Sequence, residues 1–214
     1  MSANGLHVAL LRGINVGGKH LVPMKSLAAM FEHAGCSDVV TYIQSGNVVF
    51  RAKDAAVRRL AGAIRGAIEE RFGLRVPVVL RSAAELREVA RQNVFEIPRP
   101  ARAPSLHVPK AAKDVPVGLS VVGIGTPFLA AGAAPGELHV AFLADLPAAA
   151  AVAALDPKRS PPDELVVRGR EVYLRLPNGV ARTKLTNAYL DSKLGTTCTM
   201  RSWKTVLKLA ELCG

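Results

Sequence analysis

The chain has 214 residues, half of them hydrophobic, which is enough for one or two domains that each bury a core. Its formal net charge of +11 favours partners that carry phosphate or acidic lipid, although a basic surface without any partner explains the same number. The three cysteines lack Cys-x-x-Cys spacing, which excludes a disulfide framework and a zinc knuckle and predicts a reducing, cytoplasmic location.

The first 95 residues contain strand and helix patterns in the order β-α-β-β-α-β. Short apolar or β-branched runs predict strands, and apolar residues three or four apart predict helices. The expected elements are a strand at 8–12, a helix at 23–34, a hairpin of strands 39–44 and 48–51, a helix at 54–72 and a strand at 76–81. Ser82 and Glu85 form a capping box that opens one more helix, to about residue 92. This order is that of the ferredoxin-like split unit.

Residues 96–136 interrupt this regularity and hold half of the 14 prolines, which predicts a linker or an irregular insertion. Its segment LSVVGIG retains the pattern of a strand. The uncharged run 115–136 has the length of a membrane span, but its prolines and glycines favour a loop, so we expect no membrane association. No basic segment precedes the first apolar run, and we expect no secretory signal.

The same order of elements returns after residue 136. The expected elements are a strand at 138–143, a helix at 147–155, a hairpin of strands 165–168 and 172–176, a helix at 184–194, a strand at 196–200 and a closing helix at 202–212. RSAAELREVA at Arg81 and RSWKTVLKLA at Arg201 share Arg, Ser and the final Ala, which supports a repeat. We expect an α+β fold of two tandem ferredoxin-like units, at 1–95 and, smaller, at 137–214, separated by the Pro-rich segment 96–136.

The positive charge lies in the two ends of the chain. Residues 1–95 carry 13 basic and 7 acidic side chains, and residues 158–214 carry 11 and 5, whereas residues 96–157 carry 4 and 5. A basic surface for a partner would therefore be built from both ends.

The stretch Gly13 to His20 matches the phosphate-loop pattern in every place except the last. His20 stands there for the Ser or Thr whose hydroxyl ligates magnesium, and Pro23 makes the next helix begin late. Classical nucleotide hydrolysis is therefore not expected. Consecutive glycines, Lys19 and the positive end of the following helix still favour an anion-binding loop.

Topology brings a second group of donors to this loop. In a split unit the first two strands run parallel, so the loop after Arg12 and the turn Ser45-Gly46-Asn47 leave the sheet at the same end. The expected pocket is lined by Arg12, Gly13, Asn15, Gly17, Gly18, Lys19, Gln44, Ser45 and Asn47. In the second unit, Lys184 at a helix start, Asn187 and Arg201 form a parallel cluster. The alternative is that the asparagines only satisfy turn backbone and the glycines only permit positive φ.

Other catalytic and metal-binding signatures are missing from the sequence. The five histidines have no metal-ligand spacing, and no Ser-His-acid or Cys-His arrangement is recognisable, so we expect no metal and no cofactor. His20 is expected to be an exposed loop histidine, and Cys198 a buried packing residue. No catalytic residue is assigned.

Five segments, LLRGINVGGK, YIQSGNVVF, VVRGREVYL, TKLTNAYL and TMRSWKTVLKL, resemble in this order a widespread bacterial family of uncharacterised proteins, a domain of unknown function. The resemblance covers most of the chain and implies an α+β fold with ferredoxin-like subdomains, but no activity. The matching motif positions include the residues above together with Gly46 and Trp203. Much of 99–136 departs from the family as an insertion.

The leading functional hypothesis is a protein that binds a phosphate-bearing ligand, nucleic acid or a nucleotide, at the loop from Arg12 to Lys19. One rival is an enzyme acting on a small phosphorylated or carboxylated metabolite, with Arg12 and Lys19 as an anion clamp and His20 or Ser45 near the chemistry. Another is a protein-interaction module whose basic surface is passive. A metabolite site needs one or two cations in a closed pocket, whereas a polynucleotide needs a broad basic face that joins both units.

Overall fold

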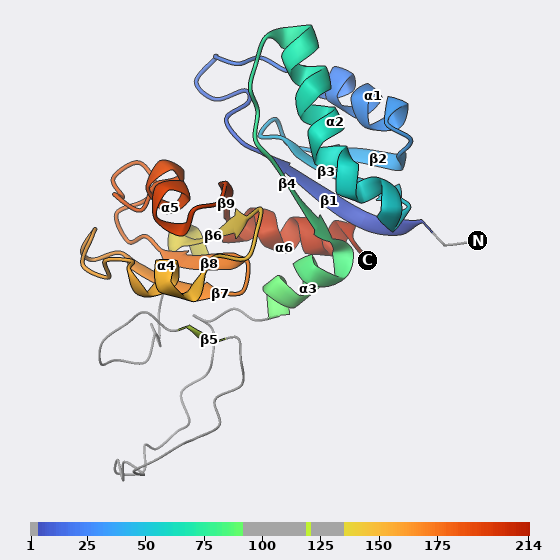
Figure 1. The fold of residues 1–214 in the computed structure, drawn as a ribbon. Coiled ribbons are helices and arrows are strands. Elements are labelled where there is room, and N and C mark those ends of the chain that lie inside the picture. The colour runs from blue at the N-terminus through green and yellow to red at the C-terminus, as the bar shows by residue number, and fades with distance from the viewer. Residues whose placement is uncertain (1–3, 92–118, 121–134) are drawn as a thin grey trace.

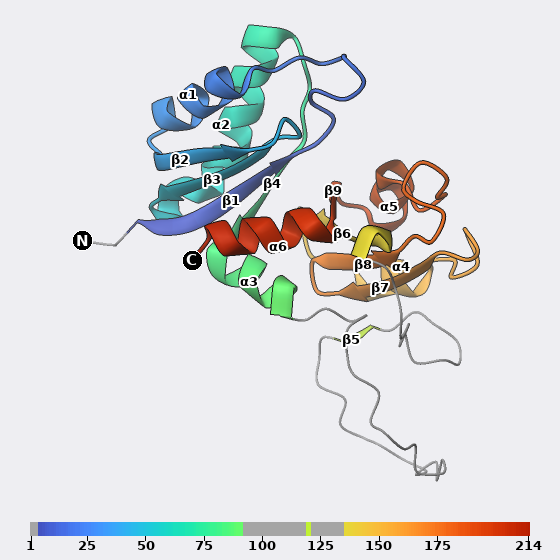
Figure 2. The ribbon, with the colours of Figure 1, turned by 180° about the vertical axis from the view of Figure 1, so that it is seen from behind.

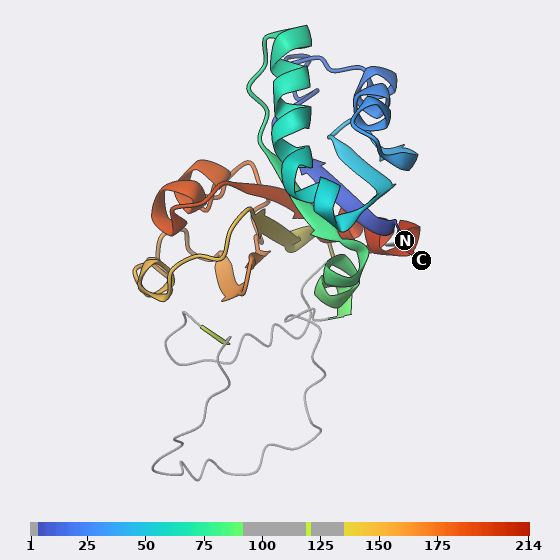
Figure 3. The ribbon, with the colours of Figure 1, turned by 45° about the vertical axis from the view of Figure 1, so that its right-hand side comes forward.

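The computed structural model describes residues 4–91, 119–120 and 135–214, which form two antiparallel sheets with helices, an α+β fold of two ferredoxin-like units (Figure 1). The first unit contains β1 (Gly5–Leu11), α1 (Met24–His33), β2 (Ser37–Tyr42), β3 (Asn47–Ala52), α2 (Asp54–Phe72), β4 (Val78–Ser82) and α3 (Ala83–Arg91). Its strands lie in the order β2-β3-β1-β4. Helices α1 and α2 cover the face of this sheet that points away from α3 and α6 (Figures 1 and 3).

The second unit repeats the first, element for element. It contains β6 (Leu138–Leu143), α4 (Ala149–Ala153), β7 (Glu164–Arg168), β8 (Glu171–Arg175), α5 (Asn187–Leu194), β9 (Cys198–Ser202) and α6 (Trp203–Leu212). A short 3-10 turn, η1 (Pro135–Glu137), precedes β6, and the two-residue strand β5 (Leu119–Ser120) extends the sheet beyond β7. The strand order β5-β7-β8-β6-β9 makes β6, β7, β8 and β9 the equivalents of β1, β2, β3 and β4. The repeat predicted from the sequence is therefore confirmed.

Some element boundaries differ from the sequence prediction for local reasons. Helix α5 begins at Asn187, because the Thr186 hydroxyl caps it by accepting a hydrogen bond from the Tyr189 N–H; Lys184 consequently lies in the preceding loop and not at a helix start. Helix α4 spans only five residues. Of the LSVVGIG segment, Leu119 and Ser120 are a strand and the rest lies outside the described residues. Among the helices described, none has both the length and the apolar character needed to cross a membrane.

The two units share a hydrophobic core. Helices α3 and α6 pack on one another and lie between the two sheets (Figures 1 and 2). One buried cluster combines residues of the first unit, such as Leu10 and Leu86, with residues of the second, such as Phe142, Trp203 and Leu209. Two further clusters lie under α1 and α2 and under α4 and α5. This shared core between the sheets holds the two units against each other.

Candidate functional site

The glycine loop predicted to bind an anion is a small hairpin, which we call the finger (residues 13–22). Val16 and Lys19 form an antiparallel bridge, with the Lys19 N–H donating to the Val16 carbonyl at 3.1 Å. Gly17 and Gly18 make the turn at φ +59° and +72°, a left-handed backbone that glycine adopts without strain. Lys19 and the side chains at the tip are exposed. The turn therefore presents one lysine and two glycines to solvent.

Asn15 holds the finger in place and is not free to bind a ligand. Its side-chain amide donates to the carbonyls of Val22 at 3.0 Å and Gln44 at 2.9 Å, and its Oδ1 accepts from the Val22 N–H at 2.8 Å. His20 Nδ1 lies 3.1 Å from the Gly13 carbonyl. These bonds preorganise the finger against the β2–β3 turn.

Arg12, at the base of the finger, is directed into the second unit. Its Nη1 donates to Asp191 Oδ2 and to the Cys198 carbonyl, both at 2.7 Å. Asp191 Oδ1 in turn accepts from the Cys198 N–H at 2.7 Å, and Asn187 Oδ1 lies 3.3 Å from the Cys198 sulfur. Burial and the neighbouring Asp191 raise the pKa of the Cys198 thiol, so this cysteine stays protonated.

Arg201, the other basic residue of the predicted clusters, is buried against the first unit. Its Nε donates to Asn47 Oδ1 at 2.6 Å and its Nη2 to the Leu11 carbonyl at 2.6 Å, with longer contacts to the carbonyls of Ser45 and Gly46. Burial lowers its pKa to about 10. Gly46 is required here, because a Cβ would lie 2.7 Å from Leu11 Cβ and its φ is +74°.

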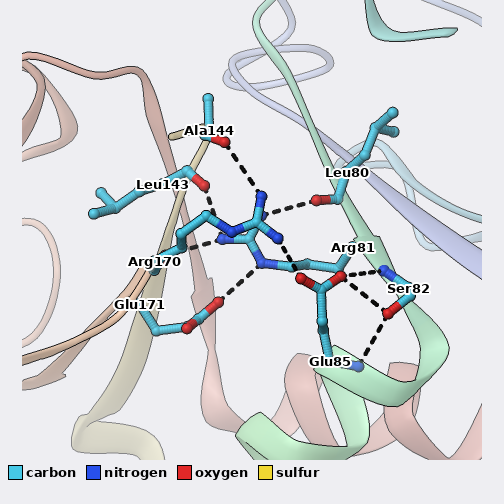
Figure 4. A network of polar contacts seen from close by, with 8 residues as sticks. All are labelled: Leu80, Arg81, Ser82, Glu85, Leu143, Ala144, Arg170 and Glu171. Atoms are coloured by element: carbon cyan, nitrogen blue, oxygen red, sulfur yellow. Dashed lines mark hydrogen bonds and ion pairs between the residues drawn. The ribbon is translucent and has the colours of Figure 1, made fainter. Parts of the chain in front are cut away.

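Arg81 makes the reciprocal insertion into the second unit, and sequence reasoning missed it (Figure 4). Its Nε donates to Glu171 Oε1 at 2.9 Å, and its Nη2 donates to the carbonyls of Leu143 at 2.8 Å and Arg170 at 2.9 Å. Burial lowers the pKa of this guanidinium, and Glu171 opposes the shift. Arg170 also pairs with Glu85. The Arg-Ser dipeptide shared by RSAAELREVA and RSWKTVLKLA is the sequence signal that could have indicated equivalent roles for Arg81 and Arg201.

Several of the predicted site residues therefore lie close together, but most of their polar side-chain atoms are bonded to other atoms of the two units. Arg12 meets Asn187 around Cys198, and Arg201 meets Asn47 and Ser45. Lys19, Gln44 and Lys184 are exposed, as are Gly13, Gly17 and Gly18. The members of the expected pocket that stay exposed therefore lie on the surface, whereas Arg12, Asn15, Asn47 and Arg201 are bonded to protein atoms.

Cations without acidic partners surround α5. Arg159 stacks over the Tyr189 ring of this helix, with its guanidinium carbon 5.1 Å from the ring centroid. The exposed cations of this region that make no ion pair with a described residue are Lys158, Arg159, Arg182, Lys184 and Lys193. The nearby carboxylates are already bonded: Asp163 to the Ser160 hydroxyl, Asp191 to Arg12, and Asp156 to the backbone N–H of Lys158. The Arg12–Asp191 pair also connects α5 to the base of the finger, which carries Lys19.

A large groove lies elsewhere, between α2 and the second unit. It has a volume of about 980 Å³ and follows β4, with α2 as one wall and Ala144, Asp145, Arg170 and Thr197 as the other. A second hollow of about 760 Å³ lies between the end of α1 and the first half of α2. No group of three or more metal-binding side chains occurs within the described ranges.

Comparison with known proteins identifies a family and a similar structure, and neither carries a described activity. The chain is similar to the conserved bacterial protein SP0830 from Streptococcus pneumoniae, with a TM-score of 0.63 at 19% sequence identity, over 99% of this chain and 100% of that one. At that identity the likeness concerns the fold alone. No curated protein matches the sequence. A family model described as "Protein of unknown function (DUF1697)" matches residues 6–113, and the chain therefore belongs to this family.

Proposed function

We propose that the protein binds nucleic acid through phosphate contacts on a basic surface that comprises Lys19 of the finger and the five unpaired cations around α5. The observation that carries this proposal is the absence of acidic partners for these cations among the described residues. Lysines and arginines that do not neutralise a carboxylate of the protein remain available to phosphate, and their exposure suits a polymer that tracks across a surface.

A polymer is favoured over a small metabolite as the ligand because the hydrogen-bond donors that could enclose a single phosphate are already bonded within the protein. A clamp for one phosphate group would need Arg12 with Asn15 or Asn47, and all three side chains are bonded to protein atoms. The remaining cations of this surface, Lys19 of the first unit and five residues of the second, lie at separate exposed positions that suit contact with several phosphates of one polymer.

The test is the salt dependence of binding, measured by fluorescence anisotropy with labelled single-stranded DNA, RNA and duplex DNA. Charge reversal at two positions, Arg182→Glu with Lys184→Glu, should weaken binding at least tenfold. On duplex DNA it should also lower the slope of log affinity against log salt by about 2, because each phosphate contact contributes about 0.9.

The matched control is Lys53→Glu with Lys204→Glu, which changes the net charge equally at two exposed positions, one just before α2 and one on α6. If this control weakens binding as much as the first variant, the basic charge acts nonspecifically and the assigned surface is wrong. Absence of salt-dependent binding to all three polymers would contradict the proposal altogether.

A further inference from the structure

The two units differ at the free edge of their sheets, although they repeat one another elsewhere. In an antiparallel ladder, alternate residues turn their N–H and C=O groups away from the partner strand. The Arg12 N–H donates to the Pro77 carbonyl at 3.0 Å, so on β4 the next residue, Val78, faces outward. The Ala144 N–H donates to the Thr197 carbonyl at 2.8 Å, so on β9 the equivalent Cys198 faces outward.

In the second unit, side chains satisfy both outward groups of this edge. The Cys198 N–H donates to Asp191 Oδ1 at 2.7 Å, and the Cys198 carbonyl accepts from Arg12 Nη1 at 2.7 Å. An acceptor and a donor side by side are what a neighbouring strand would supply. The Arg12–Asp191 pair therefore occupies the place of an additional strand beside β9.

In the first unit, the equivalent place is vacant. Leu11 pairs with Val78 as Leu143 pairs with Cys198, so Ala144 is the counterpart of Arg12. Its methyl side chain carries no donor, and it lines the groove of about 980 Å³ beside β4. No described residue bonds to the N–H or the carbonyl of Val78 outside the ladder. The outward N–H and carbonyl of Val78 thus keep their hydrogen-bonding capacity at the side of the groove.

The opposite wall of the groove is shaped by glycines and carries unpaired arginines. A Cβ added at Gly62 or Gly66 of α2 would have no neighbour within 4 Å, so packing does not account for these helix-weakening residues, and both line the groove without a side chain. Arg58 and Arg65 line the groove and pair with no described carboxylate, whereas Arg75 and Arg170 are paired with Glu69 and Glu85. Two carboxylates also line the groove: Asp54, at the start of α2, contacts His7, and Asp145, on the facing wall, accepts from the Thr196 hydroxyl. The unpaired positive charge therefore lies along the middle of α2, at Arg58 and Arg65.

We propose that the β4 groove binds an extended acidic peptide by strand addition. The N–H and carbonyl of Val78 and the N–H of Leu80 pair with the peptide backbone, while Arg58 and Arg65 contact its acidic side chains. The Leu80 carbonyl is already used, because Arg81 Nη1 donates to it at 2.8 Å. Affinity comes from main-chain bonds, and specificity comes from the arginines and the depth of the groove.

The probe for this site is a fluorescent nonapeptide of alternating glutamate and valine, used with the full chain. Two N-methylated versions, one at the glutamate amides and one at the valine amides, remove alternate backbone donors without changing charge. Strand addition with the glutamates toward α2 predicts that one of the two loses at least tenfold in affinity and the other does not. Bound peptide should also slow hydrogen exchange at the Val78 and Leu80 amides.

Two variants close the groove from opposite walls. Ala144→Arg should insert a guanidinium beside Val78, as Arg12 does beside Cys198, and weaken binding at least tenfold; the control Leu146→Arg adds the same charge at an exposed position that does not line the groove. Gly62→Leu should also weaken binding at least tenfold while raising the thermal midpoint, since leucine favours the helix. That combination cannot result from misfolding.

The proposal is overturned if the wild type does not bind the parent peptide, or if both folded variants bind it as the wild type does. Equal binding of both N-methylated peptides would also overturn it, because a surface attraction to acidic residues needs no backbone donors.

Discussion

At the scale of single residues, the structure depends on two arginines that cross between the units. Arg81 and Arg201 occupy equivalent positions, each followed by a serine that precedes a helix, and each donates to the end of the first strand and the hairpin of the opposite unit. Arg81 has Glu171 as a counter-ion, whereas Arg201 is surrounded by carbonyls and the Asn47 amide oxygen. Both guanidiniums satisfy backbone acceptors that a buried interface would otherwise leave unpaired.

We predict that Arg201→Met destabilises the protein by about 3 kcal/mol, because the Leu11 carbonyl and Asn47 Oδ1 would stay buried without donors. The midpoint of chemical denaturation measures this loss. Arg182→Met, at an exposed residue, should change stability by less than about 0.5 kcal/mol. A loss below about 1 kcal/mol for Arg201→Met would mean that water or repacking replaces its bonds.

The cysteines bear on the choice between a binding protein and an enzyme, because a reactive thiol would favour an enzyme. Cys36, Cys198 and Cys213 are buried, and burial raises the pKa of each thiol. A nucleophilic cysteine needs the opposite shift, from a cationic neighbour or a helix N-terminus. The described cysteines are therefore packing residues, as the sequence indicated for Cys198.

At the scale of elements, the start of α3 connects helix capping to the interface between the units. The Ser82 N–H and hydroxyl donate to Glu85 Oε2 at 2.8 and 3.0 Å, and the Glu85 N–H donates to the Ser82 hydroxyl at 3.2 Å. Glu85 also receives Arg170 of the second unit. Burial favours the neutral acid, but the Ser82 bonds and the arginines outweigh it and lower the pKa of Glu85.

We predict that Glu85 stabilises the fold above its unfolded pKa and that this contribution is lost as the pH falls through its lower folded pKa. Glu85→Gln retains a capping side chain without the charge, so its thermal midpoint should be lower than that of the wild type at pH 7, and the two midpoints should converge as the pH falls through the folded pKa of Glu85. Glu70→Gln, at an exposed residue of α2, is the control. Its difference in thermal midpoint from the wild type should not change as the pH falls. Parallel curves for wild type and Glu85→Gln would contradict the assignment.

In the molecule as a whole, one of the three hydrophobic cores joins the two similar units into one folded body, and each of the other two lies within a single unit. The core between the sheets contains α3 and α6 and side chains of both units, so neither unit can lose its structure without exposing apolar surface of the other. The bonds of Arg12, Arg81 and Arg201 cross the same boundary. A single cooperative transition is the expected consequence.

This cooperativity can be tested far from the interface. Ile68 lies in the outer core under α2, and Ile68→Ala should cost about 2–5 kcal/mol. The fluorescence of Trp203, in the second unit, should report this loss in full, with the same midpoint as far-UV circular dichroism. Leu190→Ala, in the outer core of the second unit, is the matched variant and should shift both signals together. A Trp203 midpoint that Ile68→Ala leaves unmoved would show that the units unfold separately.

Much of the fold could be predicted because its signals are local. Helix α2 was predicted at its observed limits, 54–72, from apolar spacing and the glycine that follows, and the 138–143 strand was predicted equally well. The capping box at Ser82 and Glu85 forms as its spacing indicated. The start of α5 was misplaced by three residues because Thr186, and not a residue near Lys184, supplies the cap.

The elements, their order and the duplication can be predicted from the amino-acid sequence, because periodicity and capping act within a few residues. The roles of the polar side chains depend on contacts that form only when the two units pack. Arg201 lies more than 150 residues from Leu11 and Asn47, and no local pattern records whether it meets a ligand or those buried carbonyls. The same holds for Arg12 and Ala144, which occupy equivalent positions in the two units. Arg12 bonds to the edge of β9, whereas Ala144 leaves the edge of β4 without a donor, and both relations arise only when the units pack.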